Sequence, residues 1–364
     1  MDNLLCDMCN HEILSDEPYR CGERELCEDC YNEHTFVCDH CREVTLTRFE
    51  VSDARICICE TCYDNHYVRC SECDELILQD DACYENSDYD EVAYCRDCYD
   101  SGFGPVIHDY YYKPEPIFFG DDKRYFGIEL EIDGAGTIRN NAQKILNTAK
   151  SDTIYIKRDG SLDDGLEIVS HPMTYEFHQN DMNWLDILNC CLNMRYTSHK
   201  AGTCGLHIHV NKIAFGETRE EQEKVISKIL YFVEKHWSEL LNFSRRTEHQ
   251  LTRWANRYGY EDKPQEILEK AKKGQVGRYV CVNISNFHTV EFRIFRGTLK
   301  FNTFIATLQL VNKICDVAIS LSEEEITNLS FASFVETITE TELIAYLKER
   351  NLYINETIEV TEEK

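Results

Sequence analysis

Apolar residues in the second half of the chain recur with two different spacings. Residues 125–133 (YFGIELEID) alternate between apolar and polar side chains, which is typical of a β-strand with one buried face. The same alternation predicts further strands over 153–157, 166–169, 205–210, 278–284 and 289–295. Between these segments the apolar residues fall three and four positions apart, which predicts helices over 140–150, 181–196, 217–242 and 301–320. Strands separated by long helices indicate an α+β domain in which helices cover an antiparallel sheet.

Apolar positions also indicate which side of a predicted helix is buried. Over 181–196 we expect one inward side formed by Trp184, Leu185, Leu188 and Leu192. Further along, Ser322-x-x-Glu325 matches a capping box and predicts another helical piece. No run of apolar residues is long enough to cross a membrane, so we expect no membrane partner.

The polar positions of the predicted strands carry a restricted set of side chains. Glu129 and Glu131 lie two residues apart, so both point to the same face of their strand. Other strands present charged or imidazole side chains in the same alternating way, namely His207 and His209, Glu291 and Arg293, and Glu167.

One strand of this kind would be an ordinary solvent-facing strand, because polar residues alternate outward in most antiparallel sheets. Four strands that show only Glu, His and Arg at their central polar positions favour one shared cleft. Several carboxylates and an imidazole in one cleft require cations, and Mg²⁺ or Mn²⁺ suits such ligands. Arginines beside the metals imply a phosphate, so the set indicates phosphoryl transfer.

Five segments of this half resemble the amidoligase family, which belongs to the carboxylate–amine ligases related to glutamine synthetase and glutamate–cysteine ligase. They occur in the family's order, over roughly 123–320, and read FGIELEID (126–133), RDGSLDDGLEIVSHPM (158–173), CGLHIHVN (204–211), RYVCVNIS (278–285) and VEFRIFRGTL (290–299). The resemblance implies a glutamine synthetase-like catalytic domain that uses ATP and Mg²⁺ or Mn²⁺. In such enzymes a carboxylate attacks the γ-phosphate to form an acyl phosphate, and an amine then displaces phosphate to form an amide.

The resemblance also implies roles for single residues. It gives the metal ligands as Glu129, Glu131, Glu167, His207 and Glu291. It places Arg293 on the transferred phosphate, His209 near the nucleotide and Arg296 on the nucleotide or the substrate carboxylate. Three further polar motif positions receive no firm role, namely Arg278, Asn283 and Asp159.

The first hundred residues contain an internal repeat of cysteine pairs. The first cysteine of each repeat follows the previous one after 32 residues, at Cys6, Cys38 and Cys70. Each repeat contains two Cys-x2-Cys pairs, and the spacing between them is that of a tetrahedral four-cysteine zinc site. We therefore expect three structural zinc ions, bound by Cys6, Cys9, Cys27 and Cys30, by Cys38, Cys41, Cys59 and Cys62, and by Cys70, Cys73, Cys95 and Cys98.

A disulfide-stapled secreted module is the alternative to zinc. Cysteines paired so closely along the chain define no useful loop, and no apolar signal segment opens the sequence. Thiols persist in reducing compartments, so we expect a cytoplasmic protein. We expect Cys21, Cys57 and Cys83 to be small buried thiols, although Cys57 is close enough to Cys59 to compete as a ligand. The repeats resemble LIM or treble-clef modules with a short helix at the second pair, but each repeat closes its own site.

Charge is distributed unevenly between the two halves. Residues 1–112 contain 28 Asp and Glu and 7 Arg but no Lys, a net charge of −21 within the total of −28. Such a surface repels phosphate backbones, so we expect no nucleic-acid partner. The excess of acidic residues suits a basic protein or peptide partner, or it only makes the protein more soluble.

These patterns predict a domain order and two classes of function. We expect zinc repeats over about 1–34, 35–66 and 67–100, a linker over 101–122, a catalytic domain over 123–320 and a helical extension over 321–364. The first function is an ATP-dependent ligase with an amino-acid, peptide or protein substrate, for which the zinc repeats provide docking. The alternative is a non-catalytic adaptor with a ligase-like domain. The sequence leaves the substrates and the oligomeric state open, although related ligases often form rings or dimers.

Overall fold

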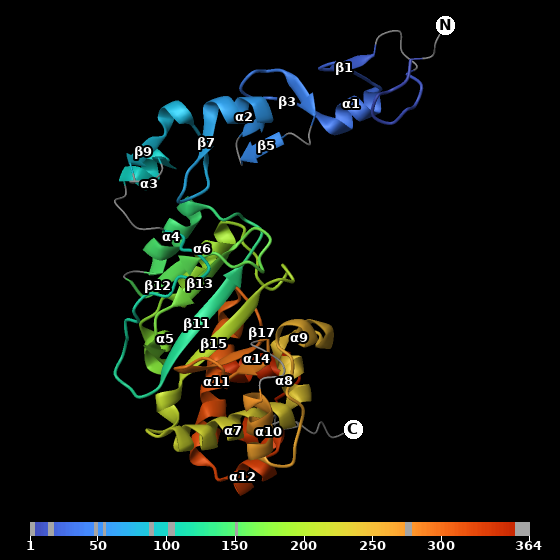
Figure 1. The fold of residues 1–364 in the computed structure, drawn as a ribbon. Coiled ribbons are helices and arrows are strands. Elements are labelled where there is room, and N and C mark those ends of the chain that lie inside the picture. The colour runs from blue at the N-terminus through green and yellow to red at the C-terminus, as the bar shows by residue number, and fades with distance from the viewer. Residues whose placement is uncertain are drawn as a thin grey trace, which may run out of the picture. The chain divides into compact units, whose positions relative to one another are not determined.

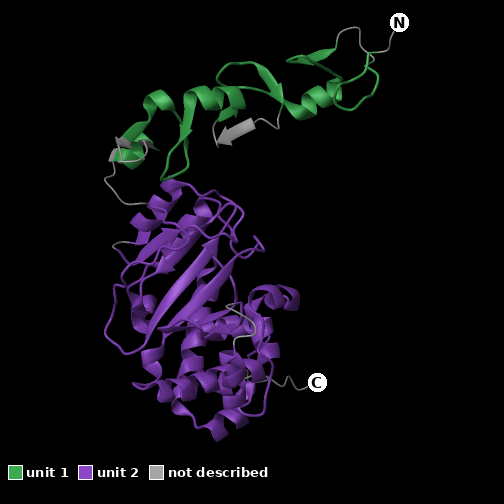
Figure 2. Ribbon diagram, in the orientation of Figure 1, with its two compact units in different colours: residues 1–105 green, residues 106–364 purple. Residues whose placement is uncertain are grey.

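The computed structural model divides the chain into two compact units, residues 1–105 and residues 106–364 (Figures 1 and 2). It describes the ranges 4–13, 18–46, 50–53, 56–86, 91–100, 106–149, 152–273 and 279–353.

In unit 1 the three repeats share one backbone turn at their first cysteine pair. The residue after each pair adopts a left-handed conformation, with φ of 58° at Asn10, 62° at Arg42 and 60° at Asp74. Its amide N–H donates 2.9 Å to the carbonyl of the first cysteine in all three repeats. The three turns lie 32 residues apart, so the period of the sequence is also a period of the structure.

Each repeat then forms a short antiparallel hairpin that leads into the second cysteine pair. The hairpins are β1 (Tyr19–Cys21) with β2 (Arg24–Leu26), β5 (Glu50–Asp53) with β6 (Ile56–Cys59), and β9 (Cys83–Asn86) with β10 (Glu91–Tyr94). As expected, a short helix starts inside each second pair, at α1 (Glu28–His34), α2 (Glu60–His66) and α3 (Arg96–Asp100).

Neighbouring repeats share their small apolar cores. The first two helices continue directly into a strand of the next repeat, which gives the pairs β3 (Thr35–Val37) with β4 (Val44–Leu46) and β7 (Tyr67–Arg69) with β8 (Leu76–Leu78). Leu46 packs with the buried cysteines of the first repeat, and Leu76 packs in the same way with those of the second. The cores of the first two repeats are therefore each completed by a leucine of the next repeat.

Unit 2 is built on a seven-stranded antiparallel sheet, in the order β12-β13-β11-β15-β17-β16, with β14 paired to β11. The central strands are β11 (Tyr125–Ile132), β15 (Gly205–Asn211) and β17 (Thr289–Arg296). The flanking strands are β12 (Ile154–Lys157), β13 (Leu166–Ser170), β14 (Met173–Thr174) and β16 (Val282–Asn283).

Helices cover one face of this sheet (Figure 1), and the side chains of that face are apolar and buried. Ile128, Leu130 and Ile132 of β11 are at most 1% exposed and share one core with the apolar residues of the neighbouring strands. The helices of this core include α4 (Arg139–Ala149), α6 (Trp184–Asn193), α7 (Arg219–Lys235), α8 (Trp237–Ser244) and α11 (Phe301–Ser320). Since the apolar residues of each strand are used here, the polar residues must occupy the opposite face.

Segments at both ends of unit 2 also pack on its core. Residues 106–122, where a linker was predicted, place the buried Ile107 in the core and pair His108 with Lys157 in an isolated bridge. Near the other end, Tyr346 and Leu347 are fully buried. The remaining helices are α5 (Tyr175–Asn180), α9 (Glu248–Trp254), α10 (Pro264–Lys272), α12 (Glu323–Asn328), α13 (Phe331–Glu336) and α14 (Thr341–Glu349).

Several sequence predictions need correction. The helix predicted over 217–242 is two helices, because His236 leaves helical geometry (φ −102°, ψ 33°) between α7 and α8. Of the strand predicted over 278–284, the described residues 279–284 form only Val282–Asn283 and an isolated bridge from Val280 to Asn256. The capping box at Ser322 is confirmed.

Two predictions about apolar segments are also wrong. Leu185 and Leu192 of α6 are each 49% exposed and do not join the buried side of their helix. The helix α11 is long and apolar enough to span a membrane by length and composition, contrary to the expectation that no such run exists. In the fold, 78% of the most apolar 18-residue stretch of this helix is buried, as expected for a helix in the core of a protein.

Candidate metal centres

The twelve predicted cysteine ligands form three separate groups, one in each repeat. One sulfur–sulfur distance between the two pairs of each repeat is 3.7 Å for Cys9 and Cys27, 4.0 Å for Cys41 and Cys59, and 3.8 Å for Cys73 and Cys95. A tetrahedron with Zn–S distances of about 2.3 Å has edges of about 3.8 Å, whereas a disulfide is about 2.05 Å long. The three groups therefore fit zinc modules, and each repeat closes its own site.

The first cysteine of each group is prepared to ionise. Burial alone would raise the pKa of the Cys6 thiol, but backbone N–H groups of Cys9 and Cys27 lower it to about 6. A hydrogen bond from the Cys73 side chain lowers the pKa of Cys70 to about 4. A thiolate is the form that binds zinc, so the fold prepares the first cysteine of each group for this role. Burial raises the pKa of the last cysteine of each group, Cys30, Cys62 and Cys98, so these thiols need the ion to lose their protons. Cys21, Cys57 and Cys83 lie outside the three groups.

The second candidate site is the polar face of the unit 2 sheet. The strand register places most of its polar residues in a row across the sheet, because each of these faces a polar partner on a neighbouring strand. The pairs are Lys157 with Glu167, Glu167 with Glu131, Glu129 with His207, His209 with Glu291, and Asn283 with Glu291.

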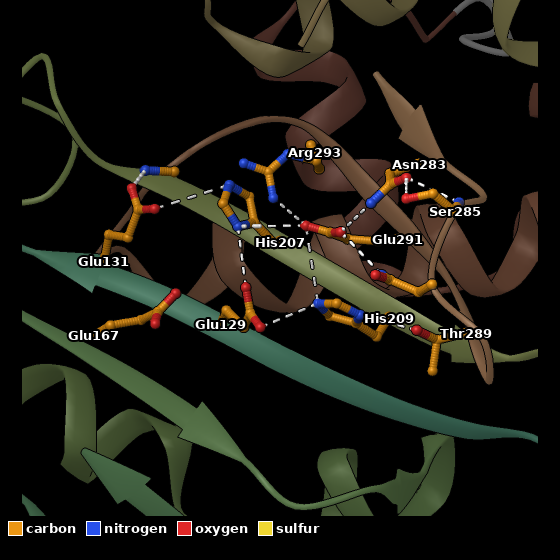
Figure 3. Close-up of polar contacts among 12 residues, drawn as sticks. Glu129, Glu131, Glu167, His207, His209, Asn283, Ser285, Thr289, Glu291 and Arg293 are labelled. Atoms are coloured by element: carbon orange, nitrogen blue, oxygen red, sulfur yellow. Dashed lines mark hydrogen bonds and ion pairs between the residues drawn. The ribbon is translucent and has the colours of Figure 1, made fainter. Parts of the chain in front are cut away.

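Within this row, two groups of three side chains lie close enough to bind a metal ion (Figure 3). The first group is Glu129, His207 and Glu291, in which His207 Nδ1 lies 3.3 Å from Glu129 Oε2 and 3.8 Å from Glu291 Oε1. The second group is Glu131, Glu167 and His207, in which His207 Nε2 lies 4.0 Å from Glu131 Oε1.

His207 belongs to both groups and uses a different ring nitrogen in each. A neutral imidazole has only one lone pair for a metal, because the other nitrogen carries the proton. The two groups are therefore alternatives for this ring, unless the imidazole loses its second proton. His207 and Glu291 are about 5% exposed, so solvent does little to screen the electrostatic interactions of the ring with either group.

The carboxylates of the two groups are tuned in opposite directions. Burial would raise the pKa of Glu129, but the charges of His209 and His207 and their hydrogen bonds hold it well below its usual range. Burial and then the Glu129 charge raise the pKa of Glu167 well above its usual range. Glu129 is thus ionised through the positive charge of its neighbouring imidazoles, so a metal ion bound here would have to replace that charge. Glu167 is harder to ionise, and Lys157 offsets part of that penalty.

Two protein cations already approach these carboxylates. Lys157 Nζ lies 2.8 Å from Glu167 Oε2, and both side chains are nearly buried. Arg293 Nη1 contacts Glu291 Oε1, while Glu291 Oε2 accepts hydrogen bonds from Asn283 at 2.9 Å and from Asn286 at 3.1 Å. A metal ion would therefore compete with, or displace, these side chains.

The donor chemistry nevertheless fits a divalent cation. Oxygen and imidazole nitrogen donors suit Mg²⁺ or Mn²⁺, and three of them converge in each group. His209 adds a further imidazole beside the first group, with its Nε2 paired to Glu129 Oε1 at 3.3 Å.

The structure places the remaining predicted residues in different surroundings. Asn283 joins the row through Glu291, whereas Asp159 lies in the loop after β12 and accepts hydrogen bonds from Ser161. Arg296 ends β17 and donates to the carbonyl of Arg245 at 3.4 Å. Arg278 lies outside the described residues.

Sequence reasoning missed three residues at this face. Lys157 ends a predicted strand, and its alternation with Tyr155 was a usable signal. Gly205 lies directly beside the side chains of Arg246 and His207. A Cβ atom at this position would lie 2.7 Å from Arg246 Nη2 and 2.6 Å from His207 Nε2. No sequence pattern marks Arg246, which follows the end of α8.

No protein-family model and no curated protein matches the chain. Among solved structures, it is similar to a bifunctional glutathione synthetase from Pasteurella multocida, with 12% identity and a TM-score of 0.37. The match covers 63% of this chain and 46% of the other, so the chain spans less than half the length of that protein. Similarity at this level does not establish a shared fold or activity.

Proposed function

We propose that the protein is an ATP-dependent carboxylate–amine ligase that forms an amide or peptide bond. The observation that carries the proposal is the pair of carboxylate–imidazole groups on one sheet face, joined at His207 and flanked by Arg293. Cation ligands beside an arginine are the parts that phosphoryl transfer requires, because its catalysis consists mainly of positioning and charge neutralisation.

In this reaction a substrate carboxylate oxygen attacks the γ-phosphorus of ATP, the bond to the bridging oxygen breaks and ADP leaves. The amine then attacks the acyl carbon of the acyl phosphate, and inorganic phosphate leaves as the amine loses a proton. Glu129, His207 and Glu291 would hold a divalent cation, which supplies charge neutralisation when bound. Arg293, freed from Glu291, would donate hydrogen bonds to the transferred phosphoryl group.

The direct test is ADP and phosphate release from ATP with Mg²⁺ or Mn²⁺ and mixtures of carboxylates and amines. Glu291→Ala should abolish the activity by removing a cation ligand. Arg293→Ala should reduce it by about 10²–10³, the usual effect of one transition-state contact. The exposed Glu266 of α10 provides a matched control, since Glu266→Ala should leave the rate unchanged. Parent-level rates in both site variants would refute the assignment.

If no activity is found, a metal-binding measurement distinguishes a wrongly assigned metal site from a correct site for which the right substrate was not tried. Mn²⁺ bound to the parent should give a calorimetric or electron paramagnetic resonance signal that Glu291→Ala weakens at least tenfold. Equal Mn²⁺ affinity in the two proteins would contradict the ligand role, whatever substrates were tried.

A non-catalytic adaptor is the second candidate, and one observation favours it. Lys157 and Arg293 already contact Glu167 and Glu291, so two carboxylates of this face have a cationic partner without added metal. An adaptor predicts that neither Mn²⁺ nor ATP binds to the purified protein. Binding of both would reject it.

We further propose that unit 1 docks a basic protein or peptide substrate, for which its surplus of acid provides the attraction. Deleting residues 1–100 should preserve turnover of a small carboxylate–amine pair and abolish modification of the docked protein. Loss of both activities with an aggregated remainder would instead assign the repeats a structural role.

A further inference from the structure

Unit 2 contains a cavity of about 1080 Å³ that no part of the proposed reaction uses. Its walls come from α6, the loop before β15, α8, the segment between β17 and α11, and the end of α14. The volume is slightly above the usual range for small-molecule sites, which is roughly 300–1,000 Å³. It is large enough for an organic ligand rather than a single ion.

The charge of the cavity is opposite to that of the chain. Five cationic side chains line it against the single carboxylate of Glu349, in a protein with a net charge of −28. They are Lys200, Arg245, Arg246, Lys300 and Arg350. Lys300 is paired with Glu349, and Arg350 donates to the backbone and side-chain oxygens of Asn242. The other three cations therefore have no carboxylate partner at this wall.

Two of these three cations make no polar side-chain contact in the part of the chain that the structure describes, and the third uses only part of its donors. Within the described residues, the side chains of Lys200 and Arg246 make no hydrogen bond and no ion pair within 4 Å. Arg245 donates to His199 Nδ1 at 3.2 Å and to the carbonyl of Arg296 at 3.3 Å, but its buried Nε has no acceptor. Burial lowers the pKa of Arg246 to about 10, against the opposing charge of Glu131, so this guanidinium remains charged at neutral pH.

The start of α11 adds to the positive potential. This 20-residue helix begins at Phe301, which lines the cavity, and no side chain caps its first amide groups. Its first turn also contains no acidic residue. Unsatisfied N–H groups at a helix start attract anions, so the helix and the three cations act in the same direction.

The remaining wall is apolar. Leu185 and Leu192 of α6 line the cavity, and their 49% exposure is explained if a ligand covers them. Leu241 and Phe301 line it as well. A site that combines unpaired cations with leucine and phenylalanine walls recognises an anionic group attached to an apolar body.

We propose that this cavity binds an organic anion, a carboxylate or phosphate ester with an apolar body, through Lys200, Arg245 and Arg246. Arg246 also approaches His207 over Gly205, so the bound anion lies one side chain away from the polar sheet face. The site stands whether or not the protein is a ligase, because binding is measured without nucleotide and without metal.

The test uses two anionic probes and one neutral probe on the full chain, with affinity measured by calorimetry. Phenyl phosphate and 4-phenylbutyrate should bind, and 4-phenylbutanamide, which has the same body without the charge, should bind at least tenfold more weakly. Tighter binding of phenyl phosphate indicates a phosphorylated ligand, and tighter binding of 4-phenylbutyrate indicates a carboxylic acid.

Variants then locate the site. Lys200→Met and Arg246→Met should each weaken the preferred anion about tenfold, as expected for one charge-assisted contact. Lys263→Met is the matched control, because Lys263 is an exposed cation outside the cavity. Lys200 is exposed, so its variant keeps the test valid even if Arg246→Met fails to fold. Equal binding of the neutral probe, or equal losses in Lys200→Met and Lys263→Met, would overturn the proposal.

Discussion

The buried imidazole of His178 should make unit 2 sensitive to mild acid. His178 is 1% exposed, its Nε2 lies 3.1 Å from the carbonyl oxygen of Phe126, and its Nδ1 lies 3.2 Å from the indole nitrogen of Trp184. A carbonyl only accepts and an indole only donates, so Nε2 carries the proton and Nδ1 is the acceptor. Protonation at Nδ1 would set two N–H groups against each other.

The magnitude follows from the pKa values of the two states. Burial lowers the pKa of His178 to about 4, whereas an unfolded histidine has a pKa of about 6.5. Between these values the unfolded chain binds more protons, so the free energy of unfolding falls as the pH falls through this window. From pH 7 to pH 4.5 the loss is roughly 2 kcal/mol.

The assay is urea unfolding followed by tryptophan fluorescence at both pH values. All three tryptophans lie in unit 2, so zinc loss from unit 1 does not enter the signal directly. His178→Gln keeps a donor and an acceptor but cannot be protonated in this range. It should therefore be less stable at pH 7 and show roughly 2 kcal/mol less acid sensitivity than the parent.

His249 of α9 is exposed and serves as the control, since His249→Gln should retain the acid sensitivity of the parent. The other acid-sensitive groups contribute equally to the variants and to the parent, so their contributions to the free energy of unfolding cancel in the comparison. If His178→Gln and the parent lost the same free energy between pH 7 and pH 4.5, a neutral buried imidazole would not be the cause.

Three further predictions concern the metal centres. Elemental analysis of the reduced protein should give three zinc ions per chain, and Cys38→Ser should give fewer, because a three-thiolate site binds zinc more weakly. Gly205→Ala should weaken Mn²⁺ binding by displacing His207, whereas Gly127→Ala should not, since its Cβ would meet only an ordinary contact at 3.6 Å; equal affinities would refute this. Lys157→Met should lower the stability of the metal-free protein by about 1–3 kcal/mol, because Glu167 loses its partner but can take up a proton, and added Mn²⁺ should restore part of the loss in a melting experiment.

The sequence by itself determined the features that depend on local spacing. Alternation along 125–133 assigns Glu129 and Glu131 to one face because successive strand residues point in opposite directions. The 32-residue period correctly predicts which cysteines belong to one group. It can do so because each Cys-x2-Cys turn is formed by residues that are close together in the chain. The segment 301–320 matches α11 in both bounds because its apolar spacing continues without interruption.

Only the tertiary structure decided which distant residues meet. Strand order and register place Glu167 opposite Glu131 and His207 opposite Glu129, and neither follows from periodicity within a single strand. Lys157 and Arg246 reach the polar face from segments that the motifs did not include. Leu185 shows the same limit, because helical spacing predicts a buried side but cannot show that the neighbouring elements leave a cavity beside it. Local patterns reflect the geometry of one element, whereas pairing, burial and charge compensation depend on elements that are far apart in the chain.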